Sequence, residues 1–230
     1  MPFFDDSGPR IEEADGPLTR SFALLREQLE RMIGLNLLWV AQGLPLLLAW
    51  AFPLPDILRL VFTLYSALAI PPATAAVFGV LREVTQGEPV GWALIAENVR
   101  THFKSGLLKL MPLYSLFFWL GALAILAEDQ GWFIVDVAVR LLLLLVLLVS
   151  LYWGPLLVAY PEWSLLRVLR RAGRLCWHNL GHTLLLGVFS LAAALLGMIS
   201  IAGMVLIVPT LVMLFQTEYY AVLEPERSEA

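Results

Sequence analysis

The chain has 230 residues, of which 60% are hydrophobic and 15% are charged, and its mean hydropathy is +0.79. Soluble domains contain about 45–50% apolar and about 25% charged residues, so a soluble protein of this composition would lack the polar surface to cover its core. The net charge of −4 and the pI of about 5.4 argue against a nucleic-acid partner. These values predict an integral membrane protein.

Stretches without Asp, Glu, Lys or Arg locate the membrane spans, because a helix needs about 20 mostly apolar residues to cross the hydrocarbon core. Five such stretches occur, and the last, between Arg174 and Glu218, has 43 residues, which is enough for two spans divided near 199–203. Strand alternation is absent, and lipid accepts only helices or closed barrels. We therefore predict one all-α membrane domain over 17–223, with six transmembrane helices approximately at 33–52, 58–81, 106–127, 133–160, 182–199 and 201–221.

Basic residues predict the orientation of these spans. With six spans, thirteen Lys and Arg residues lie on the side of both termini, and only Arg59 and Arg140 lie on the other side. Cytoplasmic loops carry the excess of basic residues, so both termini are predicted to be cytoplasmic. A five-span alternative would place the C-terminus outside. The acidic segment 1–16 lacks the basic start of a signal peptide, and we expect it and the tail at 224–230 to be disordered and solvated.

Three segments outside the spans, 18–32, 89–104 and 163–180, show the periodicity of amphipathic helices. The third has the sharpest pattern, because an apolar stripe opposes a basic stripe that contains no acid. Such a helix can lie in the membrane interface against anionic headgroups, or it can dock against the bundle or a partner protein, and both interpretations are open. The lipid- or partner-facing stripe consists of Arg167, Arg170, Arg171 and Arg174.

The order of span, proline, amphipathic helix and span occurs twice, which predicts a parallel pseudo-repeat. Span two meets Pro71-Pro72, and span four meets Gly154-Pro155. Proline removes a backbone donor and clashes with the preceding turn, so span two is predicted to bend or break. The small residues around Thr74 would allow close helix packing. The alternative is an opened backbone that lines a substrate or ion path.

Three sequence elements resemble the YesL family of bacterial membrane proteins, a domain of unknown function. They are LNLLWV at 35–40, PPATAAVFGVLREVTQGEP at 71–89, and the amphipathic segment that runs into Phe103-Lys104-Ser105. One departure is Pro71, where the family often has Gly, so this site is expected to be stiffer here. The resemblance covers about residues 20–220. It implies a bacterial inner-membrane protein, often linked to carbohydrate uptake through ABC transport systems, and it supplies no catalytic residues.

Candidate chemistry is sparse in this sequence. Asp136 and Arg140 are four residues apart and share a helix face, either as a structural ion pair at the outer interface or as a functional pair within the membrane. His178 and His182 have the spacing of two metal ligands, but two imidazoles fall short of a full ligand set. The motifs of hydrolases, nucleotide-binding proteins and metalloproteases are absent from the sequence. Amides within or near the spans are expected to bond between helices; they are Asn36, Gln42, Asn179 and Gln216.

These observations predict an accessory component of ABC transport in the bacterial cytoplasmic membrane, with a permease or its ATPase as the partner. The alternative is an autonomous small-solute transporter or channel, and a membrane enzyme is the third interpretation. We expect no enzyme activity, no cofactor and no metal. The candidate functional residues are Pro71, Pro72, Thr74, Gly154, Pro155, Asp136 and Arg140.

Overall fold

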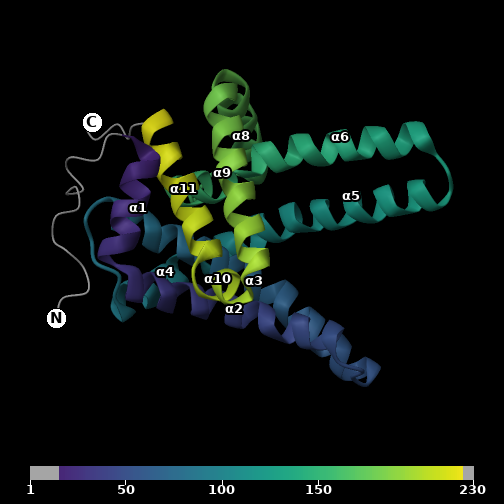
Figure 1. Ribbon diagram of the computed structural model, residues 1–230, viewed down its shortest axis with the longest axis horizontal. Coiled ribbons are helices and arrows are strands. Elements are labelled where there is room, and N and C mark those ends of the chain that lie inside the picture. The colour runs from purple at the N-terminus through teal and green to yellow at the C-terminus, as the bar shows by residue number, and fades with distance from the viewer. Residues whose placement is uncertain (1–15, 225–230) are drawn as a thin grey trace.

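A computed structural model describes residues 16–224, and the predictions for 1–15 and 225–230 lie outside the described residues. Within 16–224 the regular structure is helical, as predicted (Figure 1). The elements are α1 (Pro17–Glu27), α2 (Leu29–Ala51), α3 (Asp56–Thr85), α4 (Trp92–Ser105), the π-helical turn η2 (Gly106–Leu110), α5 (Met111–Asp129), α6 (Phe133–Ser150), α7 (Trp153–Ala159), α8 (Leu165–His178), α9 (Leu180–Ile199), α10 (Ile201–Leu206) and α11 (Val208–Leu223).

Within residues 16–224, five helical stretches are long and apolar enough to cross a membrane, which supports the membrane class. They are α2, α3, the continuous stretch Trp92–Asp129, the stretch Phe133–Ala159, and α9. The sixth predicted span is instead divided between α10 and α11. With 16 residues, α11 extends only about 24 Å, less than the roughly 30 Å of the hydrocarbon core. The prediction of six spans is therefore not confirmed.

The predicted division of the long charge-free stretch is confirmed. Helix α9 ends at Ile199, and the side chain of Ser200 caps α10 by accepting a hydrogen bond from the backbone N–H of Gly203 at 3.1 Å. The chain then turns back, so that α11 packs along α9 and reaches α1. The last segment of the chain is therefore a separate helical hairpin with α9.

Helix α3 is the central helix of the fold. In its most apolar stretch 61% of the residues are buried, against 11–28% in the other four candidate spans. It contacts α2, α4, η2, α7 and α11. Pro71 and Pro72 do not break it, because α3 continues through both of them. A Cβ on Gly106 of η2 would lie 2.8 Å from the Cα of Pro72, so this glycine allows the close packing predicted for the small-residue face.

The second proline site differs from the first, and the predicted pseudo-repeat is not confirmed. Helix α6 ends at Ser150, and α7 begins at Trp153, two residues before Pro155. Pro155 has no N–H to donate to the carbonyl of Leu151, one turn earlier. The predicted span at 133–160 is therefore two helices, whereas α3 is one.

The amphipathic segments turn different faces toward the protein. The apolar stripe of α8 is buried in the core, so this stripe docks against the bundle and does not face lipid; its buried members are Val168, Ala172, Leu175 and Cys176. Helix α4 does the reverse. It buries the polar Asn98 and His102 against α3, and it leaves the apolar side chains of Trp92 and Phe103 75% and 51% exposed.

Helices α5 and α6 form a hairpin that extends away from the other helices (Figure 1). We call residues 111–150 of this hairpin the arm. Its own cluster of buried apolar residues is small and comprises Leu120, Ala124 and Val139. In the candidate span that contains α6, only 11% of the most apolar stretch is buried. The arm therefore presents most of its apolar surface outward.

Candidate functional site

Two cavities meet at Phe78 of α3. The first, which we call the mid-bundle cavity, has a volume of about 330 Å³, and its wall includes Trp39, Thr74, Tyr114, Trp153 and Ser190. The second, the charged pocket, has a volume of about 200 Å³ and lies among Arg20, Arg82, Glu218 and Glu224. Phe78 lines both cavities. One aromatic side chain is therefore part of the wall of each.

The position of Phe78 depends on the second proline site. A Cβ on Gly154 would come within 2.0 Å of a ring carbon of Phe78, so only glycine leaves room for the ring. Gly154 lines the mid-bundle cavity, and Pro155 lines the charged pocket. The first turn of α7, directly after the break from α6, is thus placed at the boundary between the two cavities. This brings two predicted candidates, Gly154 and Pro155, into the site.

A hydrogen bond joins two of the segments that carry the resemblance. Trp39 Nε1 of α2 donates to Thr74 Oγ1 of α3 at 2.9 Å, and the Thr74 hydroxyl donates in turn to the carbonyl of Ile70 at 2.8 Å. Both Trp39 and Thr74 line the mid-bundle cavity. Thr74 is therefore part of the site, whereas Pro71 and Pro72 form the buried contact with Gly106.

Asn36 fixes the junction between α10 and α11. Its side chain is fully buried; Nδ2 donates to the carbonyl of Val205 at 2.7 Å, and Oδ1 accepts from the backbone N–H and the hydroxyl of Thr210 at 2.9 and 2.8 Å. The prediction that the amides bond between helices is confirmed for Asn36 and also for Gln42, which accepts from Tyr65. It is wrong for Asn179, which donates to the carbonyl of Leu175 one turn earlier.

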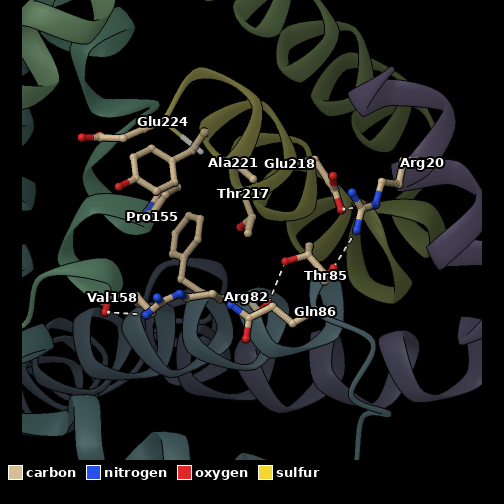
Figure 2. A pocket seen from close by; sticks show the side chains of 12 residues that line it. Arg20, Arg82, Thr85, Gln86, Pro155, Val158, Thr217, Glu218, Ala221 and Glu224 are labelled. Carbon is tan, nitrogen blue, oxygen red and sulfur yellow. Dashed lines mark hydrogen bonds and ion pairs between the residues drawn. The ribbon is translucent and has the colours of Figure 1, made fainter. Parts of the chain in front are cut away.

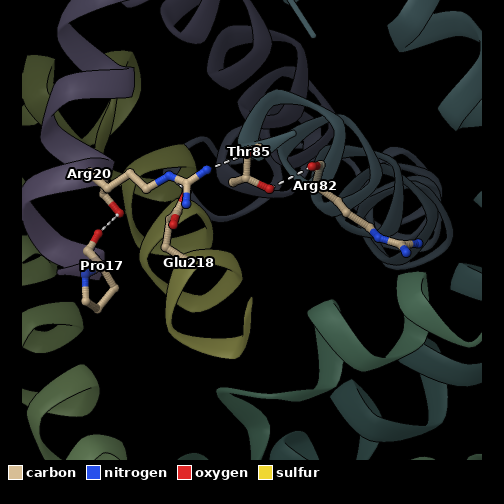
Figure 3. A network of polar contacts seen from close by, with 6 residues as sticks. Pro17, Arg20, Arg82, Thr85 and Glu218 are labelled. Carbon is tan, nitrogen blue, oxygen red and sulfur yellow. Dashed lines mark hydrogen bonds and ion pairs between the residues drawn. The ribbon is translucent and has the colours of Figure 1, made fainter. Parts of the chain in front are cut away.

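An ion pair between α1 and α11 lies at one side of the charged pocket (Figure 2). Arg20 Nε lies 3.5 Å from Glu218 Oε1, and Arg20 Nη2 donates to the carbonyl of Thr85 at 2.8 Å. Figure 3 shows the guanidinium between Glu218 and Thr85, with Arg82 directed away from them. Arg82 Nη1 instead donates to the carbonyl of Val158 at 3.5 Å.

Glu218 is a buried acid in this pocket. Its side chain is only 1% exposed, and Oε1 has no hydrogen-bond donor, although Arg20 lies nearby. Glu218 lies near the end of α11, outside the five candidate spans. Burial raises its pKa to about 7, and the charge of Arg20 opposes this shift. A carboxyl group with this pKa can exchange a proton near neutral pH.

A second ion pair closes the pocket against α8. Arg171 donates to a carboxylate oxygen of Glu224, and both side chains are partly buried. The predicted basic stripe is therefore divided: Arg171 is held by this pair, whereas Arg167, Arg170 and Arg174 are exposed. The apolar stripe of α8 is buried against the protein. The opposite face of the helix, which carries the three exposed arginines, therefore remains available for contact with lipid headgroups.

No family model, curated protein or solved structure matches the chain. The resemblance to the YesL family therefore stays a prediction.

Asp136 and Arg140 lie on the arm and line neither cavity. Arg140 Nε donates to Asp136 Oδ1, and Nη2 donates to Glu128 Oε2, each at 2.6 Å. The Arg140 side chain is 54% exposed. This geometry favours the structural interpretation of the pair, because Asp136 binds the arginine within α6 and Glu128 binds it from α5 across the hairpin.

The two predicted histidines lie apart from both cavities as well. His178 and His182 are exposed, and His178 Nδ1 lies 2.8 Å from the carbonyl of Arg174. In the part of the chain that the structure describes, no group of three or more His, Cys, Asp or Glu side chains could hold a metal ion. Among the described residues, His178 and His182 therefore lack the further ligands that a metal site would need.

Sequence reasoning missed Phe78 and Glu218. Glu218 served only as the end of the 43-residue charge-free stretch, yet an acid directly after so long an apolar stretch is itself a signal of a buried carboxylate. Phe78 is the one aromatic residue within the small-residue stretch from Ala73 to Gly79. A large ring among small neighbours signals that a cavity or a facing glycine must accommodate it.

Proposed function

We propose that this chain carries a small solute across the bacterial cytoplasmic membrane, along a path through the mid-bundle cavity and the charged pocket. The observation that supports this proposal most strongly is that Phe78 forms part of the wall of both cavities. Ligand sites in membrane bundles lie between helices, often beside a discontinuous helix. The gap between α6 and α7 is such a discontinuity, and it adjoins Phe78 through Gly154.

In this proposal both termini are cytoplasmic, and α10 together with the charge-free part of α11 up to Thr217 returns the chain to that side, so Glu218 lies beyond the crossing. Three observations support the orientation. Thirteen of the fifteen basic residues lie on the proposed cytoplasmic side. The other two are paired with acids, Arg59 with Asp56 at 3.6 Å and Arg140 with Asp136. Finally, α11 ends beside α1, where the rings of Phe22 and Phe215 pack edge to face at 5.6 Å.

Phe78 acts as the gate in this mechanism. Rotation of its ring away from Gly154 joins the two cavities, and α7 is a short helix whose preceding gap can absorb the movement. Solute then passes between an uncharged chamber and a chamber that contains Glu218. The buried carboxyl group gives the path a site for a proton or a polar group of the solute.

The test is solute flux into proteoliposomes that contain the wild type, Phe78→Ala or Phe117→Ala. Phe117 also lines the mid-bundle cavity, but it does not line the charged pocket, so its removal enlarges one cavity without opening the shared wall. We expect Phe78→Ala to raise the flux several-fold and Phe117→Ala not to raise it, because the loss of Phe117 removes a contact with the solute and opens no path into the charged pocket. Equal flux through both variants, or flux no greater than in empty liposomes, would contradict the proposal.

A second candidate function is supported by the arm, whose apolar surface faces outward. In this alternative the chain is an accessory component that binds another membrane protein, such as the permease of a carbohydrate ABC system. The only cysteine, Cys176, is buried, so introduced cysteines can be cross-linked selectively. We would place one at Leu144 on the arm and a control at Leu191 on α9, both exposed. Specific cross-linking of one stoichiometric permease through Leu144→Cys alone would support the alternative.

A further inference from the structure

The mid-bundle cavity has an uncharged wall. None of the described residues that line it is Asp, Glu, Lys, Arg or His. A charged solute that entered it would give up its hydration without gaining a counter-charge. The charged groups of the site lie on the other side of Phe78, in the charged pocket. The wall therefore favours an uncharged occupant.

Two polar groups in this wall lack hydrogen-bond partners. Trp153 is 3% exposed, and its Nε1 is buried without an acceptor among the described residues. Ser190 Oγ of α9 is also buried and has no hydrogen-bond partner within residues 16–224. Buried polar groups in native proteins are almost always bonded to protein, water or ligand. An acyl chain would offer neither group a partner, so a hydrocarbon occupant does not explain them.

Aromatic rings make up much of the remaining wall. Trp39, Phe78, Tyr114, Phe117 and Trp153 all line the cavity, and the rings of Phe117 and Trp153 are 5.7 Å apart. Such rings pack against the C–H groups of a small molecule, while a few polar groups fix its orientation. A hydroxyl group can accept from the Trp153 indole and can either donate to or accept from Ser190.

From these observations we infer that the mid-bundle cavity binds a small, uncharged, hydroxyl-bearing molecule, with Trp153 Nε1 and Ser190 Oγ as its hydrogen-bonding groups. The cavity volume of about 330 Å³ lies at the lower end of the range for ligand sites. The inference rests on the proposed transport function for its physiological meaning. The binding site itself can be tested without transport.

The experiment uses erythritol, an uncharged four-carbon polyol, and compares Trp153→Phe and Ser190→Ala with matched controls. Trp153→Phe removes the indole N–H, and Ser190→Ala removes the hydroxyl group. The serine substitution changes the side-chain volume very little, so Ser190→Ala still tests the site if Trp153→Phe folds poorly. The controls are Trp177→Phe on α8, where the side chain is 73% exposed, and Ser115→Ala on α5, where the hydroxyl bonds to its own helix. Neither control residue lines the cavity.

Two readouts are taken. One is erythritol flux into proteoliposomes, with the zwitterion glycine and the anion lactate as comparison solutes that carry ionised groups. The other is the unfolding temperature of the detergent-solubilised protein, measured at increasing erythritol concentrations. Polyols also stabilise proteins non-specifically, so the increase in each variant is compared with the increase in its control. Loss of one neutral hydrogen bond should weaken the apparent affinity by about twofold to tenfold in each cavity variant.

The outcomes separate this inference from the proposed function. Flux of glycine or lactate without flux of erythritol would overturn the substrate class and leave transport standing. Erythritol flux with the same affinity in cavity variants and controls would overturn the site alone. Affinity that falls in the cavity variants, without any flux, would support the site and contradict transport. The absence of both flux and specific stabilisation would mean that the cavity holds only water.

Discussion

The arm and the body of the molecule, by which we mean the described helices outside residues 111–150, are both apolar in sequence but differ in what they bury. The stretch Phe133–Ala159, most of which lies in the arm, has the highest mean hydropathy of the five candidate spans, 2.7, and the lowest burial. The body buries polar groups as well, including Asn36, Thr183 and Glu218. Helix α3 lies at its centre.

This difference teaches that hydropathy locates spans and does not locate function. Lipid can cover an exposed leucine at no cost, so the apolar surface of the arm fits lipid as well as a protein neighbour. A buried amide, hydroxyl or carboxyl group needs a specific partner in the same environment. Substitutions in the body should therefore lower the free energy of unfolding more than matched substitutions on the arm.

The largest effect should come from the titration of Glu218. Its pKa is about 7 in the folded protein and 4.5 for the ordinary side chain, so the folded state binds the proton more tightly than the unfolded state. This contribution is fully present below pH 4.5 and is lost as the pH rises through 7. A shift of this size corresponds to about 3 kcal/mol of stability between pH 4.5 and 8.

Chemical unfolding in one detergent at several pH values measures this slope. We expect Glu218→Gln to remove most of it, because the amide does not titrate. An unchanged pH dependence in the variant would show that another group carries the titration and that Glu218 ionises normally in the fold.

The next effect should come from Gly154→Ala, because the new Cβ would overlap the ring of Phe78. Overpacking of this kind costs about 1–3 kcal/mol. The matched control is Gly121→Ala on the arm, where a Cβ would meet nothing within 4 Å and where alanine favours the helix by up to about 1 kcal/mol. In the double variant Gly154→Ala with Phe78→Ala, the loss should be less than the sum of the two single losses. Additive losses would contradict direct contact between the two side chains.

The two proline sites illustrate how much of the fold the sequence could predict. Both carry the same local signal, a proline within an apolar span, and only one of them ends a helix. At Pro71-Pro72 the helix continues because neighbours pack tightly there, with Gly106 against Pro72. At Pro155 the preceding glycine weakens the helix further, and Tyr152 is held by α9. These contacts come from distant segments, so no local pattern contains them.

The candidate site shows the same limit. Gly154, Pro155 and Thr74 were predictable because glycine, proline and small polar residues mark unusual positions within a span. Phe78 and Trp153 were not, because an aromatic residue in an apolar span is ordinary until the facing residue is known. The hydrogen bond between Trp39 and Thr74 joins positions 35 residues apart, and only the packing of α2 on α3 brings them together.

A smaller effect is expected for Tyr152→Phe. The Tyr152 hydroxyl lies 2.7 Å from Thr183 Oγ1, and both residues are fully buried. Loss of this bond should cost about 0.5–1.5 kcal/mol and loosen the gap between α6 and α7. The control is Tyr65→Phe, where the hydroxyl bonds to Gln42 in an exposed contact. The measurement is the free energy of unfolding of the two variants. Equal losses in Tyr152→Phe and Tyr65→Phe would contradict a larger contribution from the buried hydrogen bond.

The smallest effect should come from Asp136→Asn on the arm. The substitution removes one carboxylate partner of Arg140, but the bond from Arg140 to Glu128 remains, and the guanidinium is exposed. Exposed ion pairs contribute little to stability, so the free energy of unfolding should fall by less than it does in Tyr152→Phe. Flux through proteoliposomes should be unchanged, because Asp136 lines neither cavity. Loss of flux in a variant that still folds would show that the solute path runs along the arm and not past Phe78. Function would then depend on the arm rather than on the body.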